Sequence, residues 1–154
     1  MPTEDRFPAV KRRTYLAAVG ATGSGALAGC LVPGFLESNP CADADCDVGM
    51  TRTSFVPDEI EVTTGETVVW KNTSDAWHTV TAYEGTLPEG AEYFATGGYE
   101  SERAAREAWE RGEGALNRGE TFEHTFVIPG DYGYVCIPHE PTEDPMVGIV
   151  RVRE

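Results

Sequence analysis

The stretch YGYVCIPHEPTEDPM, residues 132–146, places three kinds of soft or borderline metal ligand in one short segment. It contains the thiol of Cys136, the imidazole of His139 three residues later and the thioether of Met146 seven residues after that. Two imidazoles, one thiolate and a long axial thioether form the trigonal site that suits an electron-transfer copper ion. The stretch therefore predicts a copper site that takes one more histidine from elsewhere in the chain.

The missing ligand is one of two residues, because the chain has only three histidines. His78 lies in the strand-like segment DAWHTVT, residues 75–81, and is the preferred candidate. His124 alternates with Phe122 and Phe126, so we expect it to face the core as a hydrogen-bonded histidine and not to bind metal.

Other interpretations of the same residues remain open. Cys136 could be a buried structural cysteine, since free cysteines often behave as small apolar residues. Met146 could be a core methionine, in which case Met50 is a distant substitute as the axial ligand. A zinc site would need more cysteines or a third histidine, and a catalytic pair of Cys136 and His139 would need an orienting group and an oxyanion donor. The third histidine, His124, is expected in the core, and the sequence offers no orienting group or oxyanion donor for a catalytic pair. Copper therefore remains favoured.

Composition and charge limit the function classes. The 154 residues are 40% hydrophobic and 10% aromatic, which is enough for one folded domain with additional segments. The net charge of −14 repels polyanions and excludes nucleic acid as a partner. The acidic residues are spread along the whole chain, which favours adaptation to high salt, where ions screen the repulsion; a merely solvated acidic surface is the alternative.

Residues 1–29 are typical of an export signal. The basic run Lys11–Arg13 precedes a weakly apolar, glycine-containing stretch over residues 17–28, which is too short and polar to span a membrane. Paired arginines there resemble a twin-arginine signal, and the following Leu-Ala-Gly-Cys resembles a lipoprotein box with Cys30 as the lipidated residue. An uncleaved membrane anchor is the alternative. Both interpretations place the domain at the extracytoplasmic face of the cell membrane, and we expect it to be lipid-anchored there.

Residues 30–48 form a polar tether with two further cysteines. With Cys30 assigned to lipid and Cys136 to metal, Cys41 and Cys46 remain as a pair, which in an exported protein predicts a disulfide. Two free thiols are the alternative. A calcium loop built on the interleaved aspartates is disfavoured, because the required glycine and closing glutamate are missing.

Residues 49–154 predict an all-β domain with one helical insertion. Short β-branched runs separated by turn residues favour an antiparallel sandwich, with strands at 51–57, 59–63, 67–71, 77–82, 121–126, 132–137 and 147–152. The insertion covers about 83–118 and contains a helix at Ser101–Arg111, with Ser101 as N-cap and Gly112 after its end. Trp109 either fixes this helix to the domain or marks a partner surface.

The motif around Cys136 resembles the cupredoxins, the plastocyanin-like blue copper proteins, and most of all the halocyanins, membrane-associated members from halophilic archaea. The resemblance covers about residues 48–154. It implies a cupredoxin-like Greek-key β-sandwich with one type 1 copper ion held by four ligands: His78, Cys136, His139 and Met146. In the family, the residue after the first histidine helps to fix the thiolate through its backbone N–H; Thr79 stands there in this chain.

The chain departs from the plastocyanin pattern in two places. Six residues, two of them prolines, separate His139 from Met146, which is a longer interval than plastocyanins have. The insertion at 83–118 is also atypical. The family transfers electrons through the exposed edge of the histidine on the ligand loop, so the resemblance implies that Ile137, Pro138 and Pro141 line the docking patch beside His139.

The resemblance implies a membrane-tethered carrier that passes single electrons between protein redox partners outside the cytoplasm. We expect a monomer and no enzymatic activity, since four ligands leave no open position for a substrate. The alternative is a copper-delivery or copper-sequestering protein of the same fold. Delivery favours exposed clusters of methionine and histidine, and this chain has three methionines, the initiator included.

Overall fold

The structure is a computed structural model that describes residues 40–42 and 45–154. The predicted signal segment 1–29, the predicted lipid attachment at Cys30 and most of the tether lie outside these residues. Cys41 and Cys46 form a disulfide. Within the described ranges, no helix is long and apolar enough to cross a membrane.

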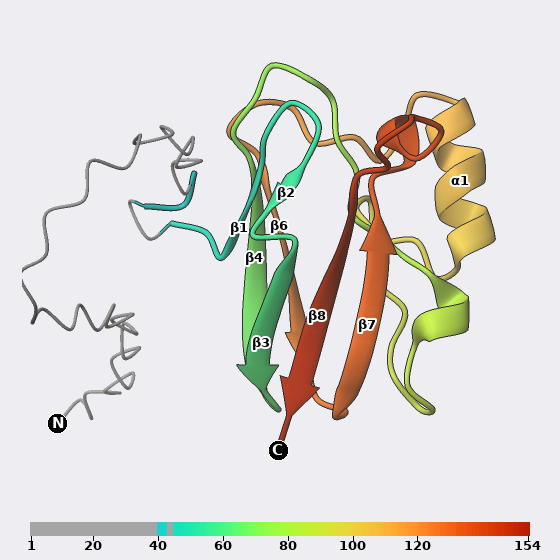
Figure 1. Ribbon diagram of the computed structural model, residues 1–154. Helices are drawn as coiled ribbons and strands as arrows, with labels where there is room; N and C mark the ends of the chain where they lie inside the picture. Colours follow the sequence, from blue (N-terminus) through green and yellow to red (C-terminus); the bar gives the residue numbers. More distant parts are fainter. Residues whose placement is uncertain (1–39, 43–44) are drawn as a thin grey trace, which may run out of the picture. The chain divides into compact units, whose positions relative to one another are not determined.

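Two four-stranded sheets make up the described domain (Figure 1). The strand order in one sheet is β2-β1-β4-β6, with bounds Phe55–Val56, Val48–Met50, Glu66–Asn72 and Thr121–Phe126. The order in the other is β3-β8-β7-β5, with bounds Glu59–Thr63, Val147–Arg153, Gly130–Val135 and Thr81–Ala82. The first strand begins at Val48, one residue before the predicted start of the domain.

Both sheets are mixed, with one parallel pair in each, so the prediction of an antiparallel sandwich was wrong for these two pairs. β1 runs parallel to β4, with Val48 opposite Trp70, and β3 runs parallel to β8, with Ile60 opposite Val150. Parallel neighbours need a crossover connection rather than a tight hairpin, and residue alternation identifies a strand without giving its direction. The predicted all-β sandwich itself is confirmed.

The core lies between the two sheets and is centred on aromatic side chains. Trp70 of β4 and Tyr134 of β7 are fully buried and meet edge to face, with ring centroids 5.4 Å apart. Phe55 also meets Tyr134 edge to face, with ring centroids 4.8 Å apart. Buried and exposed residues alternate along β4 and β8, because successive side chains of a strand point to opposite faces. The buried apolar side chains of both strands belong to the core.

Gly148 allows one of these rings to pack closely. It lies opposite Tyr134 in the β7–β8 pair, and a Cβ atom added to it would be 2.3 Å from the tyrosine ring. The absence of a side chain at this position therefore lets Tyr134 lie over the backbone of β8.

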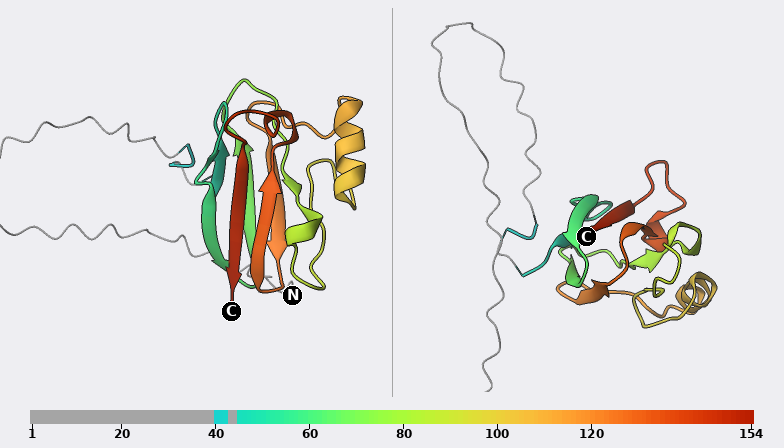
Figure 2. Two further views of the ribbon diagram at one scale, coloured as in Figure 1. Left: turned by 45° about the vertical axis from the view of Figure 1, so that its right-hand side comes forward. Right: turned by 90° about the horizontal axis from the view of Figure 1, so that it is seen from below.

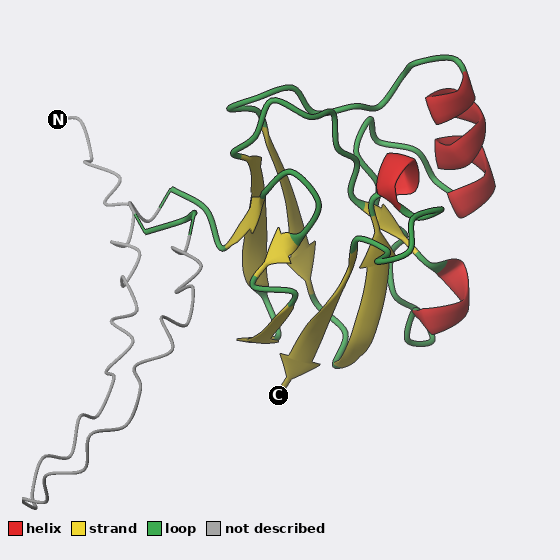
Figure 3. Ribbon diagram, turned by 45° about the horizontal axis from the view of Figure 1, so that its top comes forward, coloured by secondary structure: helices red, strands yellow, loops and turns green. Residues whose placement is uncertain are grey.

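The helix of the insertion, α1, covers Glu102–Glu110. The hydroxyl of Ser101 accepts a hydrogen bond from the N–H of Ala104 at 3.1 Å, and Gly112 after the helix end has a φ of 78°. Both features match the predicted cap and stop. In Figures 2 and 3 the helix stands outside the sheets on the side of β7, separate from the β1–β4 sheet.

The insertion is also part of the core. Phe94 is buried and stacks on Trp70, with ring centroids 6.0 Å apart. Ala95 forms an isolated bridge with Thr81, and Leu116 forms another with His78. Residues from both ends of the insertion therefore pair with the short segment before and within β5.

Three predicted strands differ from the observed ones. In the segment 77–82 only Thr81–Ala82 is a strand, because the residues before it pair singly with the insertion. The predicted strand 132–137 starts two residues earlier and ends at Val135, where the chain turns into a 3₁₀ helix, η2, at Ile137–His139. The predicted strand 51–57 is reduced to Phe55–Val56.

Candidate metal centre

The segment 136–146 is closed by its own backbone. The N–H of His139 donates to the carbonyl of Cys136 at 3.0 Å, and the N–H of Met146 donates to the carbonyl of His139 at 3.2 Å. The N–H of Cys136 in turn donates to the carbonyl of Met146 at 3.0 Å. These three bonds join the backbones of the three predicted ligands on this loop to one another, so each ligand helps to place the others.

His78 comes to the same point from the segment before β5, the strand that pairs with β7. Its N–H and C=O both bond to Leu116, at 3.3 and 2.8 Å, so its backbone is held at two points. Its ring is fully buried, and Nε2 lies 2.9 Å from the hydroxyl of Ser74. A bond at Nε2 fixes the ring and leaves Nδ1 available as a metal donor.

Both imidazoles direct Nδ1 at the same sulfur. Nδ1 of His78 lies 3.4 Å from Sγ of Cys136, and Nδ1 of His139 lies 3.3 Å from it. The potential ligand atoms of the three residues all lie within 4.8 Å of one another. Among residues 40–42 and 45–154, this is the one such group of three or more His, Cys, Asp or Glu side chains.

The histidines are electrostatically suited to bind as neutral ligands. Burial lowers the pKa of His78 to about 4, and the neighbouring His139 contributes in the same direction. Burial also lowers the pKa of His139, which is half-buried at the end of η2. Both rings therefore stay deprotonated near neutral pH, as coordination through Nδ1 requires.

The thiol is the group that changes most on metal binding. Burial raises the pKa of Cys136 to about 11, opposed by the nearby N–H groups of Thr79 and His139. A coordinated metal ion deprotonates such a thiol outright. The Thr79 N–H donates to Sγ at 3.4 Å, which is the contact that the family resemblance implied.

The donor set fits copper. A buried thiol flanked by two imidazole Nδ1 atoms provides the soft and borderline ligands that select copper over calcium, magnesium or manganese. A calcium or magnesium site would instead be lined with carboxylate and carbonyl oxygens. The three predicted ligands His78, Cys136 and His139 thus come together from two separated parts of the chain.

The two methionines occupy different environments. Met146 is 1% exposed, next to β8, and its backbone closes the ligand loop. Met50 is buried in β1 among the core side chains. The position of Met146 is compatible with the predicted axial ligand, and its coordination stays a prediction.

His124 lies outside the group that His78, Cys136 and His139 form. Its ring stacks on Phe94 at 4.7 Å and meets Phe126 edge to face at 4.8 Å. Within residues 40–42 and 45–154, the imidazole of His124 does not form the hydrogen bond that the sequence led us to expect. The ring is half-buried and serves as an aromatic surface at the edge of the core.

A hollow of about 360 Å³ lies beside the half-buried His139. Trp77, Trp109 and Pro138 line it together with the histidine, and Trp77 is 62% exposed. The sequence indicated Trp109 as a candidate for a partner surface but did not indicate Trp77. The position of Trp77 directly before the predicted ligand His78 could have indicated its place beside the metal centre. Residue alternation, however, does not show whether the side chain of Trp77 faces solvent.

Comparison with known proteins identifies a family that has this fold and this set of donor atoms. Residues 42–153 match the model of the copper binding proteins, plastocyanin/azurin family. The chain is 32% identical over 100 residues to the chloroplastic plastocyanin minor isoform of Arabidopsis thaliana, covering 65% of this chain and 51% of the relative. It is 38% identical over 88 residues to the chloroplastic plastocyanin of Fritillaria agrestis, covering 56% of this chain and 46% of the relative.

The chain thus spans about half the length of these curated relatives. Among solved structures, an oxidised amicyanin mutant is 25% identical with a TM-score of 0.50, covering 73% of this chain and 85% of the amicyanin. The family match takes in all three residues of the Nδ1–Sγ–Nδ1 group and Met146. The chain therefore belongs to the plastocyanin/azurin family of copper-binding proteins.

Proposed function

We propose that this protein is a one-electron carrier, tethered to the outer face of the cell membrane, that passes electrons between protein partners. Cupredoxin-type copper proteins typically serve electron transfer, and they exchange electrons with other proteins. The copper ion supplies a couple between its cuprous and cupric states. The observation that carries the proposal is the pre-arranged group of His78, Cys136 and His139, whose donor atoms already lie within 4.8 Å of one another.

The chain's contribution is to keep this geometry the same before and after transfer. The two histidines are held by Leu116, Ser74 and the ligand loop rather than by the metal alone. A site that does not rearrange needs little reorganisation when the charge of the ion changes. Cys136 and His78 are fully buried, which keeps water from the sulfur, and the half-buried His139 is the ligand nearest to solvent.

The direct test is the visible spectrum of the copper-loaded, oxidised protein and of its Cys136→Ser variant. The wild type is expected to show an intense thiolate-to-copper band that the variant lacks, because serine cannot supply the sulfur. A colourless wild-type protein would reject the type 1 centre. Ready loss of the cuprous ion to a weak chelator would instead favour copper delivery.

The hollow beside His139 supports one docking face for the partners. Trp77 and Trp109 form an apolar border next to the most accessible ligand, and exposed aromatic side chains are typical of interface centres. The chain carries a net charge of −14, so the partner fitted to it presents an apolar contact surface surrounded by basic residues. Electron transfer to such a partner slows as salt rises.

Replacing Trp77 with alanine tests the docking face. The expected result is a lower second-order rate of electron transfer with an unchanged reduction potential, because Trp77 is exposed and is not a predicted ligand. Val127→Ala is the control, since Val127 is similarly exposed, at 61%, and does not line the hollow. Equal rates for both variants would exclude docking at this face.

The halocyanin-like setting is the remaining part of the proposal. The twin-arginine pattern at Arg12 and Arg13 and the Leu-Ala-Gly-Cys sequence ending at Cys30 support export and lipid anchoring. Intact-mass spectrometry of the mature protein is expected to show a chain that begins at Cys30 and carries added lipid. A mature chain that starts elsewhere without lipid would reject the anchor.

The acidic composition supports a high-salt environment. The chain has 26 acidic and 12 basic residues, and screening of their mutual repulsion stabilises the folded state. The unfolding midpoint is expected to rise steadily with KCl concentration. A midpoint that is independent of KCl would argue against this adaptation.

A further inference from the structure

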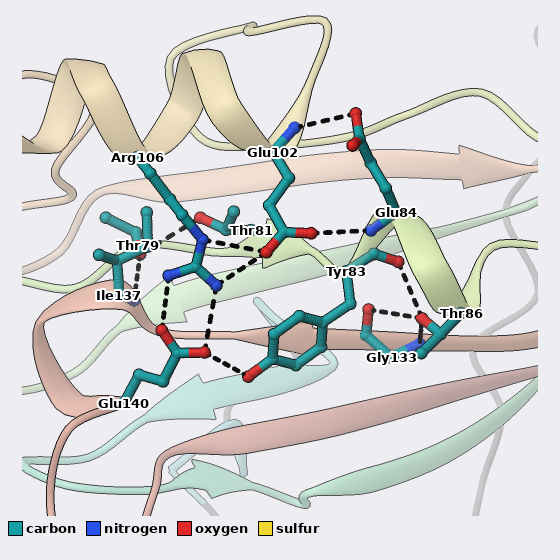
Figure 4. A network of polar contacts seen from close by, with 10 residues as sticks. All are labelled: Thr79, Thr81, Tyr83, Glu84, Thr86, Glu102, Arg106, Gly133, Ile137 and Glu140. Carbon is teal, nitrogen blue, oxygen red and sulfur yellow. Dashed lines mark hydrogen bonds and ion pairs between the residues drawn. The ribbon is translucent and has the colours of Figure 1, made fainter.

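The inserted helix is joined to the ligand loop by one charged side chain. Arg106 of α1 donates from both terminal nitrogens to the carboxylate of Glu140, at 2.5 Å to Oε2 and 3.1 Å to Oε1 (Figure 4). Glu140 is the residue that follows the predicted copper ligand His139. The helix is separated from this loop by the rest of the insertion and two strands, so the contact is a long-range connection to the metal centre.

The pair belongs to a network that fixes the arginine. Arg106 also donates to Oε1 of Glu102, from Nε at 3.0 Å and from the second terminal nitrogen at 2.8 Å. The hydroxyl of Tyr83 donates to Oε1 of Glu140 at 2.8 Å, so Glu102 and Tyr83 hold the guanidinium and carboxylate pair in place (Figure 4). Reciprocal bonds between Glu84 and Glu102 attach the start of α1 to the 3₁₀ turn η1, Glu84–Thr86, which follows β5.

The charges in the network are complementary. The bond from Arg106 is the main reason that the pKa of Glu140 lies below its usual range, and the same bond raises the pKa of Arg106. A planar guanidinium that meets a carboxylate with two parallel bonds restricts orientation as well as distance. Both side chains are partly exposed, so orientation matters more here than raw stabilisation.

Glu140 is connected to the histidine through the 3₁₀ turn η2. Its N–H donates to the carbonyl of Ile137 at 3.3 Å and closes the turn that presents His139. At the start of the turn, the N–H of Ile137 donates to the hydroxyl of Thr79 at 2.9 Å. The turn is thus held at its first residue, Ile137, by the segment of His78 and at the residue after its end, Glu140, by the inserted helix.

We propose that Arg106 is a positioning residue for His139. By fixing Glu140, the inserted helix holds η2 in the orientation that directs Nδ1 of His139 at Cys136, and it does so in the metal-free protein as well. The atypical insertion therefore forms an outer support of the copper centre in this chain. This inference deepens the proposed carrier function, since a supported turn is one that does not rearrange during electron transfer.

The test compares Arg106→Gln with Arg103→Gln. Arg103 lies on the same helix but pairs with Glu107 of that helix, so its replacement removes a charge without touching the ligand loop. In the metal-free protein, Arg106→Gln is expected to raise amide hydrogen exchange in residues 137–146 about fivefold, as loss of one partly exposed ion pair allows. Arg103→Gln leaves this exchange unchanged.

The copper-loaded variants provide a second measurement. Arg106→Gln is expected to keep the thiolate-to-copper band but to shift the reduction potential, while Arg103→Gln keeps both. Arg106→Lys, which retains the charge and loses the planar fork, is expected to restore the potential only in part. Glu140→Gln, which leaves the Arg106–Glu102 pair in place, is expected to reproduce the shift and serves where Arg106→Gln folds poorly.

Wild-type exchange and potential in both Arg106→Gln and Glu140→Gln would overturn the inference. Full restoration by Arg106→Lys would also overturn it, because simple charge would then suffice. A different observation would reject the proposed function: a wild-type protein that lacks the visible band, whatever the Arg106 variants show.

Discussion

Thr79 supports the metal centre through its backbone and its side chain. Its N–H points at the sulfur of Cys136, and its hydroxyl accepts the N–H of Ile137 at the start of η2. The hydroxyl of Thr81 donates to it at 3.4 Å. The backbone contact follows from the position after the first histidine, but the side-chain contact required the three-dimensional arrangement of two distant segments.

Thr79→Val separates these roles, because valine keeps the N–H and the shape but loses the acceptor. The N–H of Ile137 then has no partner, which costs about 1 kcal/mol of unfolding free energy. Urea unfolding of the metal-free protein measures the loss, and Thr121→Val, at an exposed site in β6, is the control. Equal stability of the two variants would contradict the role of the hydroxyl.

The axial ligand is the second residue-scale question. If the thioether of Met146 coordinates copper, Met146→Leu raises the reduction potential, since loss of a donor destabilises the cupric state more than the cuprous state. Cyclic voltammetry measures the shift. Met50→Leu, a similar change in the core, is expected to leave the potential unchanged, and equal potentials in all three proteins would exclude Met146 as a ligand.

At the scale of elements, regular strands could be predicted and the segments that carry ligands could not be placed in detail. β3, β4, β6 and β8 were found to within one residue at each end, because alternation and turn residues define them locally. The segment of His78 was predicted as a strand. Its partner is Leu116 in the insertion, and pairing across a long connection leaves no local pattern.

The pairing of β7 with β8 provides an element-scale prediction. In Gly148→Ala the new methyl group would overlap the ring of Tyr134, and relief of that overlap shifts one of two paired strands. The expected cost is about 1–3 kcal/mol of unfolding free energy, the usual range for overpacking. Urea unfolding of the metal-free protein measures it.

Gly85→Ala is the matched control, since a Cβ atom there meets no other atom within 4 Å and its φ is not positive. A loss in Gly148→Ala no larger than in Gly85→Ala would mean that the ring moves aside without cost.

At the scale of the whole molecule, the donor residues were predictable and their supports were not. Cys136, His139 and His78 could be selected because few cysteines and histidines exist in the chain and their spacing suits one metal. The ion pair from Arg106 to Glu140 could not, because charged residues are abundant and any of several arginines could pair with any of many acids. The parallel pairs β1–β4 and β3–β8 could not be predicted either, because residue alternation identifies a strand without giving its direction.

The metal-free protein is expected to lose stability in mild acid. The folded-state pKa of His78 is about 4, below the ordinary value of 6.5, so the unfolded chain binds this proton first. Stability is therefore full above pH 6.5, falls as the pH drops towards 4 and, for this residue, levels off below. The shift corresponds to about 3 kcal/mol, from 1.36 kcal/mol per pKa unit.

Urea unfolding of the metal-free protein between pH 7 and pH 4 measures the slope. His124 and His139 also have lowered pKa values and add to it in the same direction. His78→Gln is expected to flatten the curve over this window, and an unchanged slope in that variant would contradict the assignment.

The two bonds between His78 and Leu116 have a consequence for how the domain can be re-engineered or shortened. An insertion is usually the part of a protein that a designer trims first to obtain a minimal scaffold. Here the stretch 83–118 includes the backbone partner of a copper ligand and, in Arg106, the support of another. A domain trimmed of this stretch would inherit the ligands without the scaffold that orients them, so this centre is transplantable only together with its insertion.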